Sequence, residues 1–166
     1  MTTVSPVIAP ARYRIDPARS TVRFTVAQLF GLATVRGTVR IIEGAVLVAA
    51  EPGRCRVAAV LDPASFDTGN RRRDDHVRSR RFLDVGRYPT IRFTSREVSA
   101  TTVTGVLTVG EIGQRITLGL APSATGDECR FGATTRVDRY AFGVTSARGA
   151  VGRFLELDLD ITATRC

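Results

Sequence analysis

The stretch Thr21–Leu29 reads TVRFTVAQL, and it decides the fold class. Val22, Phe24 and Val26 fall on one face of an extended chain, because successive side chains of a strand point to opposite faces. Threonine and arginine occupy the positions between them. Strands with one apolar and one polar face are typical of antiparallel sheets, since parallel sheets are usually covered on both faces. The stretch therefore predicts a β-strand whose apolar face lines a protein interior.

The same two-residue alternation recurs along most of the chain. It occurs at residues 35–41, 91–96, 103–109, 115–120, 130–137 and 155–161 and, less clearly phased, at 45–50 and 56–62. These stretches predict eight or nine strands, which must close into a barrel or pack as a sandwich. Glycines inside strands favour bent strands and hence an antiparallel barrel. They are Gly37, Gly105, Gly119 and Gly132.

The inward side chains are mostly valine, isoleucine, leucine and phenylalanine. A barrel of eight strands either fills its interior with such side chains or holds one apolar ligand. The alternation does not separate these two cases, so each inward residue is a candidate for core packing and for ligand contact. The candidate ligand-binding residues are Val22, Phe24, Val26, Val39, Ile41, Phe93, Leu107, Leu118, Leu157 and Leu159.

Chain length and composition limit the kinds of protein that this sequence can encode. A chain of 166 residues predicts one domain, at residues 12–166, preceded by a loose arm at residues 1–11 that contains two prolines. No apolar run is long enough for a transmembrane helix, and the N-terminus lacks the pattern of a secretory signal, so we expect a cytoplasmic protein. The three cysteines are far apart and there is one histidine, so we expect no metal site and no cofactor.

The segment Asn70–Val85, NRRRDDHVRSRRFLDV, holds six arginines, three aspartates and the only histidine. Its first part, residues 70–80, is the one strong helix candidate. The net charge of +8 invites nucleic-acid binding. However, single-strand binders need exposed aromatic side chains for stacking, and most phenylalanines here fall on inward faces. The sequence has no tryptophan either, so we expect no nucleic-acid partner.

Catalysis by the lone histidine is the rival hypothesis. His76 has Ser79 three residues later, within reach on a helix, but the chain contains no GxSxG motif. Packing of the His76 ring against the barrel rim is the favoured interpretation, and we assign no catalytic residue. An enzyme acting on a small hydrophobic metabolite in the same barrel would use His76, Asp138, Arg139 and Tyr140. A filled barrel serving as an interaction module is the third alternative.

A longer series of residues is similar to a known family. The series comprises Thr68, the run 73–79 (RDDHVRS), Phe82, Asp84 and the run 88–95 (YPTIRFTS), with supporting matches at 15–16, 20–24, 105–108 and 137–143. It resembles the YceI-like family of bacterial polyisoprenoid-binding proteins over about residues 13–163. The resemblance implies an all-β, antiparallel, eight-stranded, lipocalin-like barrel with a short helical excursion near residues 70–80.

The resemblance also implies a function. Family members bind isoprenoids or comparable lipids in the barrel interior, often as dimers, and most are not known as enzymes. We therefore expect non-enzymatic binding, transport or sequestration of a long-chain isoprenoid or similar lipid, with a homodimer as the assembly. The surplus arginines of the 70–85 segment are expected to attract an anionic lipid head group or an anionic membrane surface.

Some residues acquire roles only through the resemblance. Arg73, Asp74 and His76 look like a structural latch, in which an Arg73–Asp ion pair fixes the segment while its apolar side chains are buried. The family usually has histidines where this chain has Arg19 and Gln28. Gln28 is expected to line the ligand site and to donate a hydrogen bond to a polar head group.

Overall fold

The computed structural model describes residues 8–29, 31–123, 127–147 and 150–166. Within these ranges the chain forms nine strands, one short α-helix and two 3₁₀ turns. The strands are β1 (Ala11–Ile15), β2 (Thr21–Gln28), β3 (Ala33–Val48), β4 (Arg56–Asp67), β5 (Ile91–Val98), β6 (Thr102–Val109), β7 (Ile112–Pro122), β8 (Glu128–Asp138) and β9 (Val151–Arg165). The helix is α1 (Arg71–Arg78), and the turns are η1 (Pro52–Arg54) and η2 (Arg139–Phe142).

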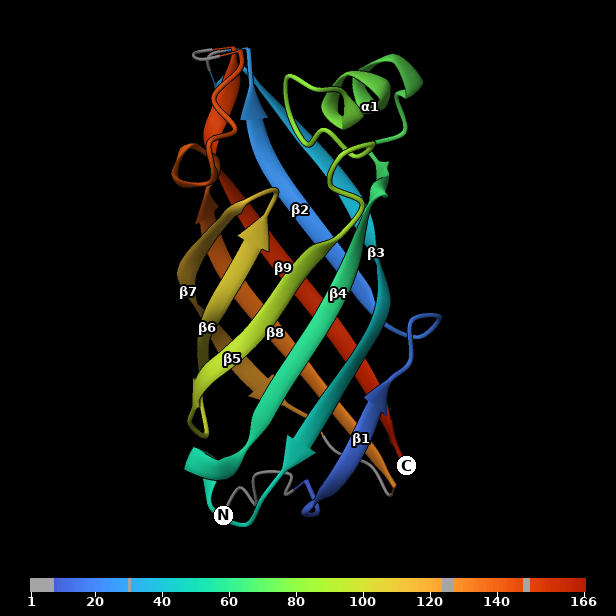
Figure 1. Cartoon of the computed structure of the whole chain (residues 1–166), viewed down its shortest axis with the longest axis vertical. Helices are drawn as coiled ribbons and strands as arrows, with labels where there is room; N and C mark the ends of the chain where they lie inside the picture. The colour runs from blue at the N-terminus through green and yellow to red at the C-terminus, as the bar shows by residue number, and fades with distance from the viewer. Residues whose placement is uncertain (1–7, 30, 124–126, 148–149) are drawn as a thin grey trace.

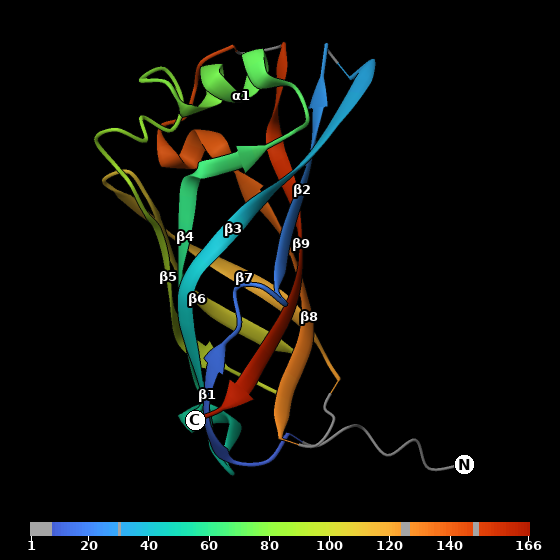
Figure 2. The ribbon, with the colours of Figure 1, turned by 90° about the vertical axis from the view of Figure 1, so that its right-hand side faces the viewer.

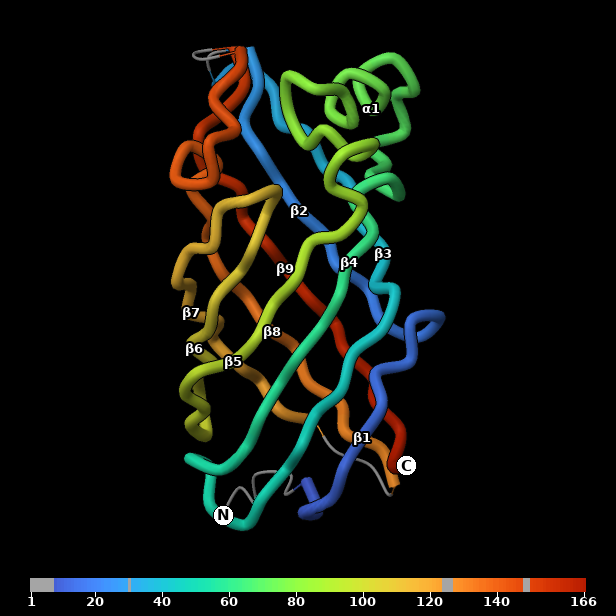
Figure 3. Tube along the Cα trace, viewed as in Figure 1, coloured from blue at the N-terminus to red at the C-terminus, as the bar shows by residue number. Residues whose placement is uncertain are grey.

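The strands close into an eight-stranded barrel, as predicted (Figure 1). Every neighbouring pair is antiparallel, in the order β3-β2-β9-β8-β7-β6-β5-β4, and β4 pairs back onto β3. The ninth strand does not widen the ring. Both β1 and β2 lie between β3 and β9, one after the other, so together they fill one place. The tube in Figure 3 shows the strands running obliquely around the barrel.

Buried side chains fill one end of the barrel. Tyr13 and Ala163 are almost fully buried there, and the Tyr13 hydroxyl donates to the carbonyl of Ala9 at 2.6 Å. Ile8 packs against this cluster and Ala11 begins β1, so the described part of the predicted N-terminal arm belongs to the barrel. The rest of that arm, residues 1–7, lies outside the described residues. The full closed-end cluster is Tyr13, Ile15, Val22, Ile41, Val46, Cys129, Ile161 and Ala163.

The helix covers the other end of the barrel (Figures 1 and 2). It begins after Asn70, whose side chain accepts a hydrogen bond from the backbone N–H of Arg73 at 3.0 Å, as a helix N-cap does. It ends at Arg78, two residues before the end that the sequence predicted. No helix in the described ranges is long and apolar enough to cross a bilayer.

Candidate functional site

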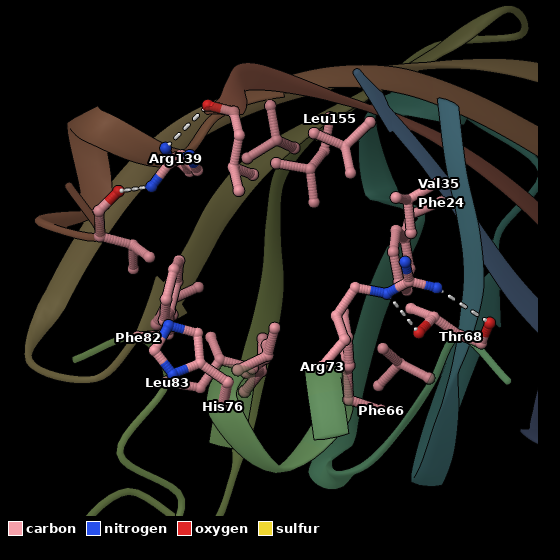
Figure 4. Close-up of a pocket in the computed structure, with 18 of the residues that line it drawn as sticks. Phe24, Val35, Phe66, Thr68, Arg73, His76, Phe82, Leu83, Arg139 and Leu155 are labelled. Atoms are coloured by element: carbon pink, nitrogen blue, oxygen red, sulfur yellow. Dashed lines mark hydrogen bonds between the residues drawn. The ribbon is translucent and has the colours of Figure 1, made fainter. Parts of the chain in front are cut away.

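A cavity of about 850 Å³ occupies the barrel interior beneath α1 (Figure 4). Most of its wall is apolar and comes from the inward faces of the strands and from the segment over the mouth. Concave, mostly apolar hollows of this size are typical of small-molecule binding sites. The apolar lining consists of Val22, Phe24, Val26, Val35, Val39, Leu61, Phe66, Val77, Phe82, Leu83, Ile91, Leu107, Val109, Val137, Phe142, Val144, Ala147, Val151, Leu155 and Leu157.

The structure places part of the predicted ligand-binding set on this wall. The predicted residues that line the cavity are Val22, Phe24, Val26, Gln28, Val39, Leu107 and Leu157. Their contact with a ligand stays a prediction. Other residues that line the cavity could not be predicted from the alternation, because they lie at strand ends or in loops. Phe66 is one of them, and its ring stacks on Phe24 with centroids 4.7 Å apart.

Four predicted residues do not line the cavity. Ile41 belongs to the closed-end cluster, and Leu159 packs against that cluster. Phe93 packs against a second cluster around Leu107, and Leu118 is buried opposite Val103 in the β6–β7 ladder. All four have the inward orientation that alternation predicted. The alternation does not report how far along the barrel axis a residue lies, so it did not separate packed core from cavity wall.

Polar side chains gather where the cavity opens. The lining includes Gln28 at the end of β2, Arg73 and His76 on α1, and Arg139 on η2. A cavity that is apolar within and polar at its mouth suits a ligand with an apolar chain and a polar head. The complete polar lining is Gln28, Thr68, Asn70, Arg72, Arg73, Asp75, His76 and Arg139.

The latch that holds α1 over the mouth acts through Thr68. The Asp74 side chain is 3% exposed, and its two carboxylate oxygens accept hydrogen bonds from the Thr68 backbone N–H at 3.1 Å. Arg73 donates from Nε to the Thr68 hydroxyl at 2.9 Å and from Nη2 to the Thr68 carbonyl at 3.4 Å. The prediction of an Arg73–Asp ion pair is therefore wrong, because Arg73 donates its hydrogen bonds to oxygens of Thr68 instead of to a carboxylate.

Arg78 is a further anchor of α1, although the sequence pattern predicts no such role for it. Its Nε donates to the carbonyl of Ala64 at 2.9 Å, and its Nη2 donates to the carbonyl of Phe66 at 2.6 Å. Its Nη1 contacts Asp75 at 3.0 Å. Because Ala64 and Phe66 belong to β4, these bonds tie the helix to the barrel wall. The only sequence signal was its position inside the 73–79 run.

The described ring contact of His76 is with its own helical segment and not with a strand of the barrel rim. The His76 ring lies edge-on to the ring of Phe82, with centroids 5.0 Å apart, and both residues line the cavity. The Ser79 hydroxyl donates to the His76 backbone carbonyl rather than to the ring. The pair therefore lacks the arrangement of a nucleophile with its base.

The other residues of the enzyme hypothesis have structural contacts. Asp138 accepts hydrogen bonds from Arg153 at 2.8 and 2.9 Å, and this partner lowers the pKa of its carboxyl below the ordinary value. Asp138 also accepts from the backbone N–H of Tyr140 at 3.0 Å. Among the described residues, no hydrogen bond joins His76 to Asp138, Arg139 or Tyr140.

The guanidinium of Arg139 fixes the loop that follows η2. The side chain is 6% exposed and donates four hydrogen bonds to backbone carbonyls at 2.8–3.0 Å. Its partners are Val144, Ser146, Val151 and Gly152. Arg139 therefore shapes the rim of the mouth, on the side that faces α1.

Fold and site together define a class: a closed antiparallel barrel with an apolar internal cavity beneath a short helix. The sequence profile of the YceI-like domain matches residues 13–163, so the chain belongs to the YceI-like family. A UPF0312 protein of Yersinia enterocolitica is 31% identical over 124 residues, which cover 69% of this chain and 65% of that protein.

Two solved structures share the fold. Burkholderia cenocepacia BcnA superposes with a TM-score of 0.78 at 21% identity, covering 90% of this chain and 99% of that one. A polyisoprenoid-binding domain from Saccharophagus degradans, described as implicated in plant cell wall breakdown, gives a TM-score of 0.70 at 12% identity. The alignment covers 95% of this chain and all of that domain, and at these identities both likenesses concern the fold alone.

Proposed function

We propose that this protein binds a long-chain isoprenoid or similar lipid in the barrel cavity and carries or sequesters it without chemical change. The observation that carries this proposal is the apolar cavity of about 850 Å³, which is closed at one end and opens beneath α1. The Saccharophagus domain supports it by analogy, since that protein of the same fold is described as polyisoprenoid-binding. Homodimerisation and a cytoplasmic location stay predictions.

The energetics favour a long apolar ligand. Burial of apolar chain contributes about 0.8 kcal/mol per CH₂ group, against the loss of ligand freedom on binding. The deeper part of the cavity wall offers few hydrogen-bonding groups to a ligand, because the polar side chains gather at the mouth. We therefore expect affinity to rise with chain length, while Gln28, Arg73 and His76 contact the head group.

The first experiment identifies co-purifying material. Freshly purified protein is extracted with organic solvent and the extract is analysed by mass spectrometry beside a matched control protein. An isoprenoid or other long-chain lipid at near-equal stoichiometry supports the proposal and names the ligand class. A clean extract, repeated after native-host lipids have been offered, contradicts it.

Two neighbouring substitutions on β9 localise the site. Leu155 lines the cavity, whereas Glu156 is exposed on the outer face. Leu155→Trp should occupy part of the cavity and lower the amount of bound lipid, while Glu156→Trp should leave the bound lipid unchanged. The chain has no tryptophan of its own, so the emission of the introduced indole also reports whether its surroundings are apolar. Equal lipid content in both variants would place the ligand outside the barrel.

A further inference from the structure

The turn between β2 and β3 presents apolar side chains to solvent at the mouth of the barrel. Leu32 is 88% exposed and Leu29 is 54% exposed. Backbone hydrogen bonds fix this geometry: the N–H of Leu32 bonds to the carbonyl of Leu29 at 3.1 Å, and the N–H of Leu29 bonds to the carbonyl of Ala150 at 2.7 Å. Two exposed leucines at one turn thus offer an apolar surface to a partner.

Arginines without an ion pair lie at the same end of the barrel. Arg71, Arg72, Arg80 and Arg81 are exposed, and none forms an ion pair with another described residue. The carboxylates nearest in the sequence do not pair with them: Asp74 is buried against Thr68, Asp75 pairs with Arg78, and Asp84 forms no ion pair with a described residue. We call these four arginines the mouth arginines.

On the barrel wall, some of the arginines are paired with carboxylates and others, such as Arg36 and Arg40, are not. Ion pairs across neighbouring strands join Arg23 to Asp158 at 3.9 Å, Arg115 to Glu97 at 3.6 Å and Arg136 to Glu156 at 3.3 Å. Charge on these parts of the wall is therefore balanced within the protein. At the mouth, arginines without an ion pair and exposed leucines lie at the same end of the barrel, a combination that complements an anionic lipid surface with an apolar interior.

We propose that the mouth of the barrel docks on an anionic lipid bilayer, with Leu29 and Leu32 entering the acyl boundary and the mouth arginines contacting lipid head groups. This inference rests on the proposed function, because the cavity opens between these two features: Gln28 and Arg72 both line it. Docking in this orientation lets a lipid pass between bilayer and cavity without exposure of its chain to water.

Co-sedimentation of the full chain with vesicles tests the docking. The wild type should bind vesicles of phosphatidylglycerol and phosphatidylcholine and should bind pure phosphatidylcholine vesicles much more weakly. Leu32→Ser should lower the partition coefficient about tenfold, because it removes most of the apolar transfer of one leucine. The double variant Arg80→Ser/Arg81→Ser should lower it by about fivefold per arginine at low salt.

Matched controls lie on the barrel wall along β3, which begins directly after Leu32. Leu47→Ser changes a half-exposed leucine near the opposite end, and Arg36→Ser/Arg40→Ser removes two exposed arginines of the wall. All variants should keep the wild-type Tm, since the side chains are exposed. Equal losses for Leu47→Ser and Leu32→Ser, or a wild type that ignores anionic vesicles, would overturn the proposal.

A second readout separates this proposal from the binding function. Farnesol, a short isoprenoid, should raise the Tm of the wild type and of Leu32→Ser equally, because the cavity is intact in both. Farnesol binding without vesicle binding overturns the docking alone. Leu32-dependent vesicle binding without any response to farnesol supports the docking and removes the isoprenoid function.

Discussion

Thr68 connects the end of β4 to the first turn of α1. Its backbone N–H, hydroxyl and carbonyl all contact the side chains of Asp74 and Arg73. Arg78 adds two bonds to carbonyls of β4. Thr68 thus forms hydrogen bonds with the side chains of both Arg73 and Asp74. Arg78 attaches the helix to backbone carbonyl oxygens of the barrel wall.

Substitution of these arginines tests the latch. Arg73→Ala and Arg78→Ala should each lower the free energy of unfolding by about 1.5–3 kcal/mol, the usual contribution of hydrogen bonds to charged groups. Arg71→Ala, at an exposed position, should change it by less than about 0.5 kcal/mol. Thermal unfolding monitored by circular dichroism measures the difference. Negligible shifts for all three variants would show that the bonds do not hold the segment.

Cysteine reactivity reports whether the far end is closed. Cys129 is 1% exposed in the closed-end cluster, and burial raises the pKa of its thiol from the ordinary 9.0 to about 11. A raised folded pKa favours the neutral thiol, so its contribution to stability is complete below pH 9 and is lost as the pH rises toward 11.

At pH 8.5, iodoacetamide should therefore modify the exposed Cys166 of the native protein and leave Cys129 intact until urea is added. Peptide mass spectrometry quantifies both sites. Modification of Cys129 as fast as that of Cys166 in the native state would mean that the end of the barrel opens.

At the scale of elements, two glycines allow neighbouring parts of the barrel to approach closely. A Cβ on Gly105 would lie 2.4 Å from the carbonyl oxygen of Thr94 and 2.7 Å from the ring of Phe93. A Cβ on Gly37 would lie 2.4 Å from the Phe24 ring. These contacts explain why β6 and β3 carry glycine inside a strand, where it is otherwise unfavourable.

Alanine substitution distinguishes required from incidental glycines. Gly105→Ala should destabilise the protein by about 1–3 kcal/mol, because the added methyl group meets backbone that cannot move aside cheaply. Gly119→Ala on β7 is the matched control, since its nearest contact would be 3.6 Å from the Thr134 hydroxyl. Urea denaturation compares them. Equal tolerance of both substitutions would show that the β5–β6 pair relaxes without cost.

The strands were predictable, but their arrangement along the barrel was less so. Alternation in β2 and β9 predicted which side chains point inward, since that depends only on local geometry. It did not predict that β1 and β2 share one place in the ring, because that depends on both pairing with β3 and β9. For the same reason the alternation predicts Ile41 and Leu159 as candidate ligand contacts, whereas both pack at the closed end.

At the scale of the whole molecule, the barrel has one filled end and one covered end. The cover consists of two segments from distant parts of the sequence, the helical segment and the loop after η2. The Ser146 hydroxyl donates to the carbonyl of Arg81 at 2.7 Å and joins them across the mouth. Arg139 holds the loop, and its guanidinium lies 5.9 Å from the centroid of the Phe82 ring. This contact closes one side of the mouth.

Ser146→Ala should therefore speed ligand release more than it lowers stability. The lost hydrogen bond contributes about 1 kcal/mol, which corresponds to a roughly fivefold faster transfer of a fluorescent isoprenoid from protein to acceptor vesicles. The Tm should change little, because four bonds from Arg139 still fix the loop. Ser123→Ala, at an exposed serine after β7, is the control and should release at the wild-type rate. If Ser146→Ala also transfers at the wild-type rate, the ligand does not leave between the helical segment and the loop after η2.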